Sequence, residues 1–408
     1  MSREVPRSWV AGLVLVSIGM WSGLFGPIQV LLAEQAQALA PGHKEAALSL
    51  VTGVGAAVST VLNPVWGAFS DRTTLHRGRR LPWVLGGAAG GVVAMLLLSG
   101  AGSILEMTLA WALAQAALNA MLAAITATVP DQVPAGERGG VGGALAVAQT
   151  LGVVGGTGIA AATGSTAAGY LTLAGVLVVT TTPYALNARD RAIGREERPP
   201  LALKDFWVSP RRHPDFGWAW ITRFLMNLGN ALLILYLLYY LKDAVGLPDD
   251  EADGTVFALT AVYGLCTVVT ASVGGYWSDR AGRRKVFVIW SGLITAAALL
   301  LFALAPTLAS TLGPPMPAVW AGAVALGVGF GAYTAVDFAL VTQVLPTADD
   351  RARDLGVINI ATALPQVLAP VLAAGVLGLG LGYTGLYLLA ALVSVLGSVL
   401  VVRIRSVV

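Results

Sequence analysis

Two ionisable residues, Arg223 and Asp337, lie inside long apolar stretches of the sequence, away from the ends of those stretches. A charge at the centre of a bilayer costs about 2.5–3.5 kcal/mol on insertion scales, so such a residue is expected to face a cavity or a partner. We predict that Asp337 carries a proton and that Arg223 is its partner or modulator, because a nearby guanidinium favours the charged carboxylate. The alternatives are a permanent ion pair that locks two helices, and an arginine whose head group reaches the membrane interface.

Polar residues at helical spacing form a second group that could bind a solute. Gln115 and Asn119 are four residues apart, which places them on one face of a helix. Amides and hydroxyls exchange hydrogen bonds with sugar hydroxyls, and an aromatic face suits the C–H side of a sugar ring. The alternative is that these residues only join helices, at about 0.6 kcal/mol each. The predicted substrate-binding residues are Trp21, Ser22, Gln29, Gln115, Asn119, Asn227, Asn230, Tyr333, Asn359 and Gln366.

The composition predicts an all-α membrane protein. The 408-residue chain is 56% hydrophobic and 12% charged, about half the charged fraction of a soluble globular chain. Its apolar stretches reach about 20 residues, enough to cross about 30 Å of hydrocarbon, whereas buried strands of soluble α/β enzymes run only about 4–8 residues. The sequence has no nucleotide-binding loop, metal-ligand cluster or nucleophile–base arrangement, so we expect neither an enzyme nor a cofactor.

Twelve apolar stretches predict twelve transmembrane helices, with ends uncertain by about 2–4 residues. The polar stretch 188–216 divides them into two six-helix bundles at 1–187 and 217–408, and we interpret it as a cytoplasmic linker whose arginines could also bind anionic lipid head groups. The predicted spans are 9–33, 48–70, 82–104, 107–130, 141–163, 168–187, 217–241, 255–278, 285–305, 317–343, 355–378 and 381–403.

The distribution of basic residues predicts the orientation in the membrane. Of the 25 Lys and Arg residues, Lys44 and Lys242 fall in the loops of one side and Arg223 lies inside a span. All the others lie at the termini or in the loops after the second, fourth, sixth, eighth and tenth spans. Cytoplasmic loops carry the excess of Lys and Arg, so both termini are predicted to be cytoplasmic. The loop with Asp249, Asp250, Glu251 and Asp253 would then face outward, and the basic charge needs no nucleic acid to explain it.

One loop sequence occurs in both halves of the chain. GAFSDR at 67–72 follows the second span and GYWSDR at 275–280 follows the eighth, and both copies end in Gly-Arg-Arg, at 78–80 and 282–284. A glycine would let two helices approach closely, and an aspartate facing arginines across the loop could hold the cytoplasmic side shut. The alternative is ordinary positive charge on cytoplasmic loops. The predicted gate residues are Gly67, Asp71, Arg72, Arg79 and Arg80 in the first copy and Gly275, Asp279, Arg280, Arg283 and Arg284 in the second.

The duplicated six-helix unit resembles the major facilitator superfamily over nearly the whole chain. The resemblance implies two six-helix bundles with pseudo-twofold symmetry and solute transport by alternating access. It also implies a central cavity lined by helices one, four, seven and ten, and a protein that can work as a monomer in the cytoplasmic membrane.

A finer resemblance rests on the first loop copy. Six residues (72–77) separate Asp71 from Gly78, whereas only two separate Asp279 from Gly282. This long form, followed by Arg-Arg-x-Pro-aromatic, resembles the sucrose/proton symporters and the glycoside–pentoside–hexuronide group. The segments 335–346 and 353–366 resemble bacterial members near that branch.

The sequence departs from two other carrier groups. Cation-coupled melibiose-type carriers have acidic residues in helices two and four, where this chain has Asn63 and Asn119. Sodium coupling through that arrangement is therefore not expected. The fifth span has glycines but lacks the proline of the motif found in proton/drug antiporters.

These observations favour a secondary active transporter that moves a saccharide or glycoside together with protons. The alternative is proton-driven efflux of drugs, metabolites or sugars, and a third hypothesis is a transporter-like scaffold that senses or assembles. The expected partners are a small polar solute, protons and membrane lipid.

Overall fold

The computed structural model describes residues 6–75, 78–134, 137–187, 190, 213–281, 283–344 and 351–406. The chain divides into two compact units, Met1–Leu201 and Ala202–Val408. Within the described residues, 12 helical segments are long and apolar enough to cross a membrane, six in each unit. The all-helical membrane architecture predicted from composition is therefore confirmed.

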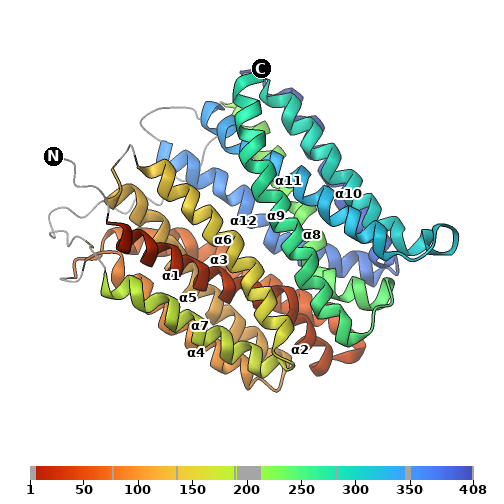
Figure 1. The fold of residues 1–408 in the computed structure, drawn as a ribbon, viewed down its shortest axis with the longest axis horizontal. Coiled ribbons are helices and arrows are strands. Elements are labelled where there is room, and N and C mark those ends of the chain that lie inside the picture. The colour runs from red at the N-terminus through yellow and green to blue at the C-terminus, as the bar shows by residue number, and fades with distance from the viewer. Residues whose placement is uncertain are drawn as a thin grey trace. The chain divides into compact units, whose positions relative to one another are not determined.

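The first unit runs from the red to the yellow-green part of the ribbon (Figure 1). Its elements are α1 (Arg7–Gly26), a π-helical segment (Pro27–Leu31), α2 (Leu32–Leu39), a 3-10 turn (Pro41–His43), α3 (Lys44–Asp71), α4 (Leu81–Ser99), α5 (Ile104–Gln132), α6 (Arg138–Ala162) and α7 (Thr166–Leu186).

The second unit continues from green to blue (Figure 1). Its elements are α8 (Pro214–Tyr239), a π-helical segment (Tyr240–Ala244), α9 (Asp249–Ala281), α10 (Arg284–Leu312), α11 (Met316–Val344), α12 (Arg351–Gly378), α13 (Gly382–Leu400) and a 3-10 turn (Val401–Arg403).

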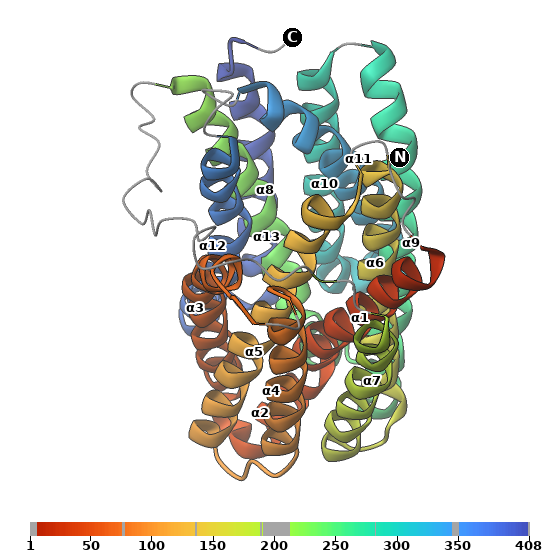
Figure 2. The same cartoon turned by 90° about the vertical axis from the view of Figure 1, so that its left-hand side faces the viewer.

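The two units pack their helices by the same scheme. In the first unit α5 packs against α3 and α4, α1 packs against α6 and α7, and α4 packs against α7 (Figure 2). In the second unit α11 packs against α9 and α10, α8 packs against α12 and α13, and α10 packs against α13. Each helix of one unit thus has the same neighbours as its counterpart six spans later, which is the pattern expected of a duplicated unit.

The first span differs from its prediction because of a proline. The predicted helix 9–33 extends to Leu39, and it widens into a π-helical segment at Pro27–Leu31. Pro27 has no backbone N–H and its ring crowds the carbonyl four residues earlier, so the regular α-helical ladder cannot continue through it. Gln29 is buried inside this widened turn.

Two boundaries in the second unit also differ. Asp249, Asp250, Glu251 and Asp253 were predicted to lie in a loop, and that prediction is wrong, since they form the start of α9. Their outward side remains a prediction. Acidic side chains stabilise the positive end of the helix dipole, so they favour helix in that first turn. The helix α8 begins at Pro214, before the predicted 217, and most of the predicted linker 188–216 lies outside the described residues.

Candidate functional site

The second unit brings Arg223 and Asp337 together. Arg223 lies on α8 and Asp337 on α11, and Arg223 Nη1 lies 3.1 Å from Asp337 Oδ2. The hydroxyl of Tyr333, one turn earlier on α11, donates to Asp337 Oδ1 at 2.8 Å. Asp337 is only 6% exposed, so its carboxylate is separated from water. The Arg223 guanidinium and the Tyr333 hydroxyl stabilise it instead.

Arg223 also connects α8 to a third helix. Its Nε donates to Thr362 Oγ1 on α12 at 2.9 Å. The Nδ2 of Asn227 donates to the Arg223 carbonyl oxygen one turn back, at 2.8 Å. The guanidinium therefore joins α11 through an ion pair and α12 through a neutral hydrogen bond. Protonation of Asp337 would remove the first of these attractions and leave the second.

An apolar cluster flanks this site. Met226 of α8, Val288 of α10, and Tyr333, Val336 and Leu340 of α11 are all nearly inaccessible to solvent. A low-dielectric surrounding strengthens the attraction between opposite charges. The same surrounding makes an isolated charge costly. These surroundings therefore favour the paired charges of Arg223 and Asp337 over either charge alone.

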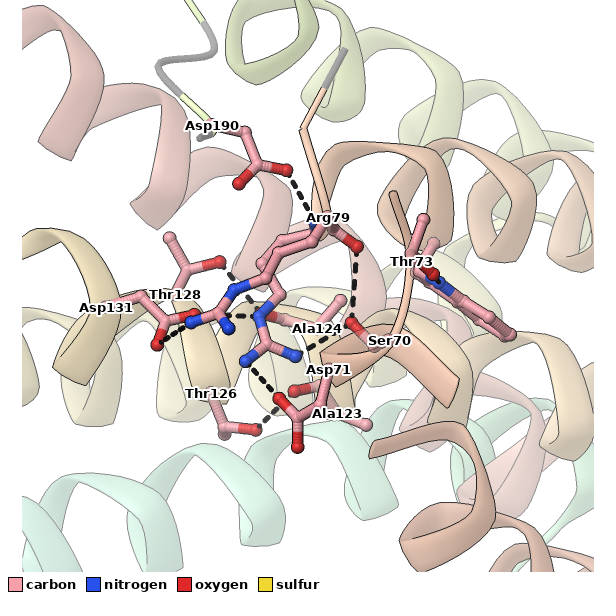
Figure 3. Close-up of polar contacts among 12 residues, drawn as sticks. Ser70, Asp71, Thr73, Arg79, Ala123, Ala124, Thr126, Thr128, Asp131 and Asp190 are labelled. Atoms are coloured by element: carbon pink, nitrogen blue, oxygen red, sulfur yellow. Dashed lines mark hydrogen bonds and ion pairs between the residues drawn. The ribbon is translucent and has the colours of Figure 1, made fainter. Parts of the chain in front are cut away.

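The first copy of the repeated loop forms a charged network at the ends of three helices of the first unit (Figure 3). Arg80, just before α4, is 3% exposed. Its Nη2 forms an ion pair with Asp71 at the end of α3, its Nη1 donates to Ser70 at 2.9 Å, and its Nε contacts Asp131 Oδ2 at 2.8 Å. Arg79 binds the other oxygen of Asp131. The network ties the ends of α3, α4 and α5 within one unit.

Asp190, which follows α7 in the sequence, completes this network. Its Oδ2 accepts the backbone N–H of Arg80, and that of Leu81 at 2.7 Å. These are N–H groups at the start of α4, which have no partner inside the helix. A carboxylate there also complements the helix dipole. Asp190 thus acts as a cap on α4 that is supplied from a distant part of the sequence.

The remaining predicted gate residues take different positions. A Cβ built on Gly67 meets no described atom within 4 Å, so the described helices of the first unit show no close approach there. Arg72 follows the last residue of α3. Arg280, Arg283 and Arg284 lie at the end of α9, in the following turn and at the start of α10. Gly275 and Asp279 lie on α9, and the surroundings of Gly275 and the side chain of Asp279 are outside what the structure describes.

Amides of the first unit form a ladder between α3 and α5. The Nδ2 of Asn119 donates to Gln115 Oε1 at 3.0 Å, and the Nδ2 of Asn63 donates to Asn119 Oδ1 at 3.1 Å. Trp21 of α1 packs against Phe25, with ring centroids 5.8 Å apart. The predicted pairing of Gln115 with Asn119 on one helix face is found, and Asn63 extends it to a second helix.

Other predicted substrate residues hold helices together or lie at the surface. The hydroxyl of Ser22 on α1 donates to the carbonyl of Gly152 on α6 at 3.0 Å. Asn230 accepts a hydrogen bond from the Tyr263 hydroxyl of α9 at 3.3 Å. Gln366 is exposed on α12. The side chain of Asn359 lies outside the described residues.

Sequence reasoning missed several residues of these networks, among them Asp131, Asp190 and Thr362. Asp131 ends the fourth span, beside the charged loop, so an acid at that position was a usable signal. Asp190 falls in a stretch dense in charges, and nothing in its spacing distinguishes it from its neighbours. Thr362 is a lone hydroxyl in an apolar helix, which gives no signal of its partner.

Comparisons with known proteins agree with this architecture. A sequence model described as Major Facilitator Superfamily matches residues 10–261 and 251–407. The crystal structure of a POT family transporter in complex with a thioalcohol-conjugated peptide is similar, with a TM-score of 0.75 at 13% sequence identity over 97% of this chain and 95% of that chain.

A second similar structure is a bacterial homologue of the human lysosomal transporter Spinster, in an inward-facing and occupied conformation. Its TM-score is 0.68 at 14% identity, covering 97% of this chain and 94% of that chain. A search of curated proteins found no match. The family match covers both units and their twelve spans, so this chain is a multi-pass membrane transporter, not an enzyme, and it belongs to the major facilitator superfamily.

Proposed function

We propose that this transporter couples the movement of a polar solute to the movement of protons, and that Asp337 carries the proton. The observation that supports the proposal is the buried Arg223–Asp337 ion pair within membrane-spanning helices, 3.1 Å between the charged atoms. Ionisable residues at membrane depth are costly and characteristically mark proton and substrate pathways.

The proposed coupling follows from the partners of the two charges. When a proton binds Asp337, Arg223 loses its counter-charge on α11 but keeps Thr362 on α12. The attraction between α8 and α11 therefore weakens selectively. A proton thus binds Asp337 less tightly when Asp337 is paired with Arg223 than when the two are apart. That difference in affinity lets the proton shift an alternating-access equilibrium.

The gate residues have a part in the same proposal. Two six-helix bundles, 1–187 and 217–408, would move around a solute site, and the Asp71 and Asp279 loops would hold the cytoplasmic side shut in the outward-open state. The Asp71–Arg80–Asp131 network supports this role for the first loop, because it makes the ends of α3, α4 and α5 move together. Both termini would be cytoplasmic, in the inner membrane, and the protein would work as a monomer.

A saccharide or glycoside is the proposed solute. The long first loop resembles the sucrose/proton symporter branch, and the Asn63–Asn119–Gln115 ladder offers amides that could exchange their partners for sugar hydroxyls. Proton-driven efflux is the second candidate. The stacked rings of Trp220 and Phe224, with centroids 5.4 Å apart, are the kind of aromatic surface that hydrophobic cations bind.

Proton movement in proteoliposomes tests the proposal. Purified protein is reconstituted with pyranine in the lumen, and disaccharides, glycosides, short peptides or cationic dyes are added outside. A proton symporter acidifies the lumen when its solute is present. We expect a sugar to give this signal, Asp337→Asn to abolish it, and Asp250→Asn to retain it, because Asp250 is an exposed acid in the first turn of α9.

Two results would contradict the proposal. Full proton-driven accumulation by Asp337→Asn would remove the proton role from this carboxylate. Silence with every sugar, together with proton movement on addition of cationic dyes, would make efflux the function.

A further inference from the structure

An open groove runs along the outer surface of the first unit. It lies between α3 and α4, with α5 as its floor, and has a volume of about 500 Å³. Trp66 and Thr73 line one side, Trp83 and Gly86 the other, and Ala117 the floor. None of these residues belongs to the proposed proton site or to the amide ladder.

Glycines of α4 make this groove. A Cβ built on Gly86 meets no described atom within 4 Å, so open space lies directly over the helix backbone there. Further along, a Cβ on Gly90 would come within 2.9 Å of the Ala117 side chain, so α4 and α5 lie close together at the bottom. The glycines of α4 therefore leave a hollow that no described residue fills.

The lining offers almost no hydrogen bonds to a ligand. The indole N–H of Trp66 donates to the Ala116 carbonyl at 2.9 Å, and that of Trp83 donates to Thr73 Oγ1 at 2.8 Å. The Thr73 hydroxyl itself donates to the Phe69 carbonyl at 2.9 Å. Because these donors are already used, a sugar or a row of waters would find few partners, and a hydrocarbon chain fits the groove better.

The groove is short enough to lie within one leaflet. Its lining on α4 runs from Pro82 to Gly90, which is about 12 Å at 1.5 Å per residue. That is somewhat less than half of the ~30 Å hydrocarbon thickness. Exposed apolar side chains continue past it on the same helix, among them Val93 and Leu97. The groove therefore continues into an exposed apolar face of α4, and its lining begins at the first turn of that helix.

A basic residue directly precedes the lining of the groove in the sequence. Arg79 and Arg80 are engaged with Asp131 and Asp71. Arg72, directly before the lining residue Thr73, has no ion-pair partner among the residues that the structure describes. An apolar furrow could bind the acyl chain of a phospholipid, and the nearby guanidinium of Arg72 could bind its anionic head group.

We propose that this groove binds one acyl chain of an anionic phospholipid from the leaflet beside the α3–α4 turn, with its phosphate at Arg72. The chain fills space that would otherwise lack van der Waals contacts, which is the main source of packing energy inside a membrane. The guanidinium makes the site selective for a net negative head group. The bound lipid would pack against Trp83, close to the charged network that ties α3 to α4.

Native mass spectrometry of the purified full-length protein tests this site. The protein is titrated with phosphatidylglycerol or with phosphatidylcholine of the same acyl chains. We expect the wild type to retain phosphatidylglycerol preferentially, by about fivefold, the contribution of one basic residue near a lipid head group. Gly86→Leu should lose the bound lipid, because the new side chain occupies the groove. Gly175→Leu is the matched control, since Gly175 on α7 also has open surroundings.

A second pair of variants tests the head group. Arg72→Gln should bind both lipids equally, whereas Arg7→Gln, at an exposed position at the start of α1, should keep the preference. Equal lipid retention by Gly86→Leu and Gly175→Leu would overturn the groove assignment, and an unchanged preference in Arg72→Gln would overturn the head-group assignment.

Photolabelling locates the chain without any variant. Phosphatidylglycerol with a diazirine in one acyl chain is bound to the wild-type protein and irradiated. Cross-links in peptides that contain residues 82–90 or 113–120 are expected, because these segments line the groove. Labelling confined to other helices would refute the proposal.

Discussion

Arg80 and Arg223 have different surroundings. The guanidinium of Arg80 contacts two carboxylates and one hydroxyl, from Asp71, Asp131 and Ser70, and its side chain is 3% exposed. That of Arg223 has one carboxylate and one hydroxyl as partners, and its side chain is 17% exposed. A single proton on Asp337 removes the ion pair that Arg223 forms with it, whereas Arg80 keeps a second carboxylate if it loses one. This difference suits Arg80 to a structural role, and it suits Arg223 to a role in which its ion pair forms and breaks.

The Arg223–Asp337 pair gives a prediction for stability. Asp337→Leu should lower the free energy of unfolding by about 3 kcal/mol, because it leaves a charged guanidinium without its counter-charge. The value is at the low end of the range for buried pairs, since Arg223 retains some exposure. The double variant Arg223→Met with Asp337→Leu should recover most of the loss. The measurement is unfolding of each variant in mixed micelles by an SDS titration.

The single variants Arg223→Met and Asp337→Leu are the controls for the double variant. If the double variant were as unstable as the sum of both single variants, the two side chains would not interact, and the ion pair would have no energetic role. Recovery in the double variant combined with loss of proton movement would separate the stabilising role of the pair from its proposed transport role.

At this scale the sequence predicted the pair but not its setting. Two lone charges in apolar spans must be satisfied, so partnership of Arg223 with Asp337 was a direct expectation. The sequence could not choose between a coupling site and a permanent lock, because both use the same residues. It could not find Thr362 either, since a hydroxyl in a helix can satisfy itself on the carbonyl one turn back.

At the scale of helices, the backbones of α1 and α6 approach closely in the first unit. A Cβ built on Gly156 of α6 would lie 2.6 Å from the Ser22 carbonyl oxygen of α1, and a Cβ on Gly26 would lie 2.7 Å from the Gly156 carbonyl oxygen. The hydroxyl of Ser22 spans the same interface to Gly152. Small residues let membrane helices pack at this distance and gain van der Waals contact.

Gly156 and its neighbour Gly155 make a matched pair of variants. Gly156→Ala should destabilise the protein by about 1–3 kcal/mol, because the added methyl group pushes against the backbone of α1. Gly155→Ala meets no described atom within 4 Å, so it should be neutral or more stable by up to about 1 kcal/mol through helix propensity. Thermal unfolding of both variants in detergent, followed by tryptophan fluorescence, measures the difference. Equal unfolding temperatures would show that the two helices can separate freely.

Hydropathy predicted the number of helices and missed their ends for a physical reason. It reports the part of a helix that lies in hydrocarbon, whereas a helix continues wherever its backbone hydrogen bonds and caps allow. The polar residues 249–254 therefore extend α9, and Ser103 begins α5 by accepting the N–H of Glu106. The π-helical segment at Pro27 was foreseeable as an irregularity, but not as a widened turn.

At the scale of the molecule, the repeated loop predicted a duplicated unit. The two units repeat the same five helix pairings, although only the loop signature is visibly repeated in their sequences. Apolar helices tolerate many substitutions as long as small residues remain at the contacts, so the fold is retained while the sequence similarity between the halves fades. This is why a short charged loop was a better marker of the duplication than the spans.

The orientation of the whole chain is the remaining prediction, and two glycines test it. Gly102 lies in the turn between α4 and α5, and Gly140 near the start of α6, on the sides predicted to be external and cytoplasmic. The sequence has a single cysteine, so Cys266→Ala provides a cysteine-free background. In intact cells, a membrane-impermeant maleimide should label Gly102→Cys.

The same reagent should label Gly140→Cys only after the membrane is permeabilised. Both glycines have open surroundings: a Cβ on Gly140 meets no described atom within 4 Å, and one on Gly102 meets only the end of Glu106 at 3.8 Å. Differences in labelling therefore report the side of the membrane. The reverse pattern would place the basic loops outside, against the bias that sets the orientation of most membrane proteins. It would also put the Arg80 network, and the lipid groove beside it, in the outer half of the bilayer.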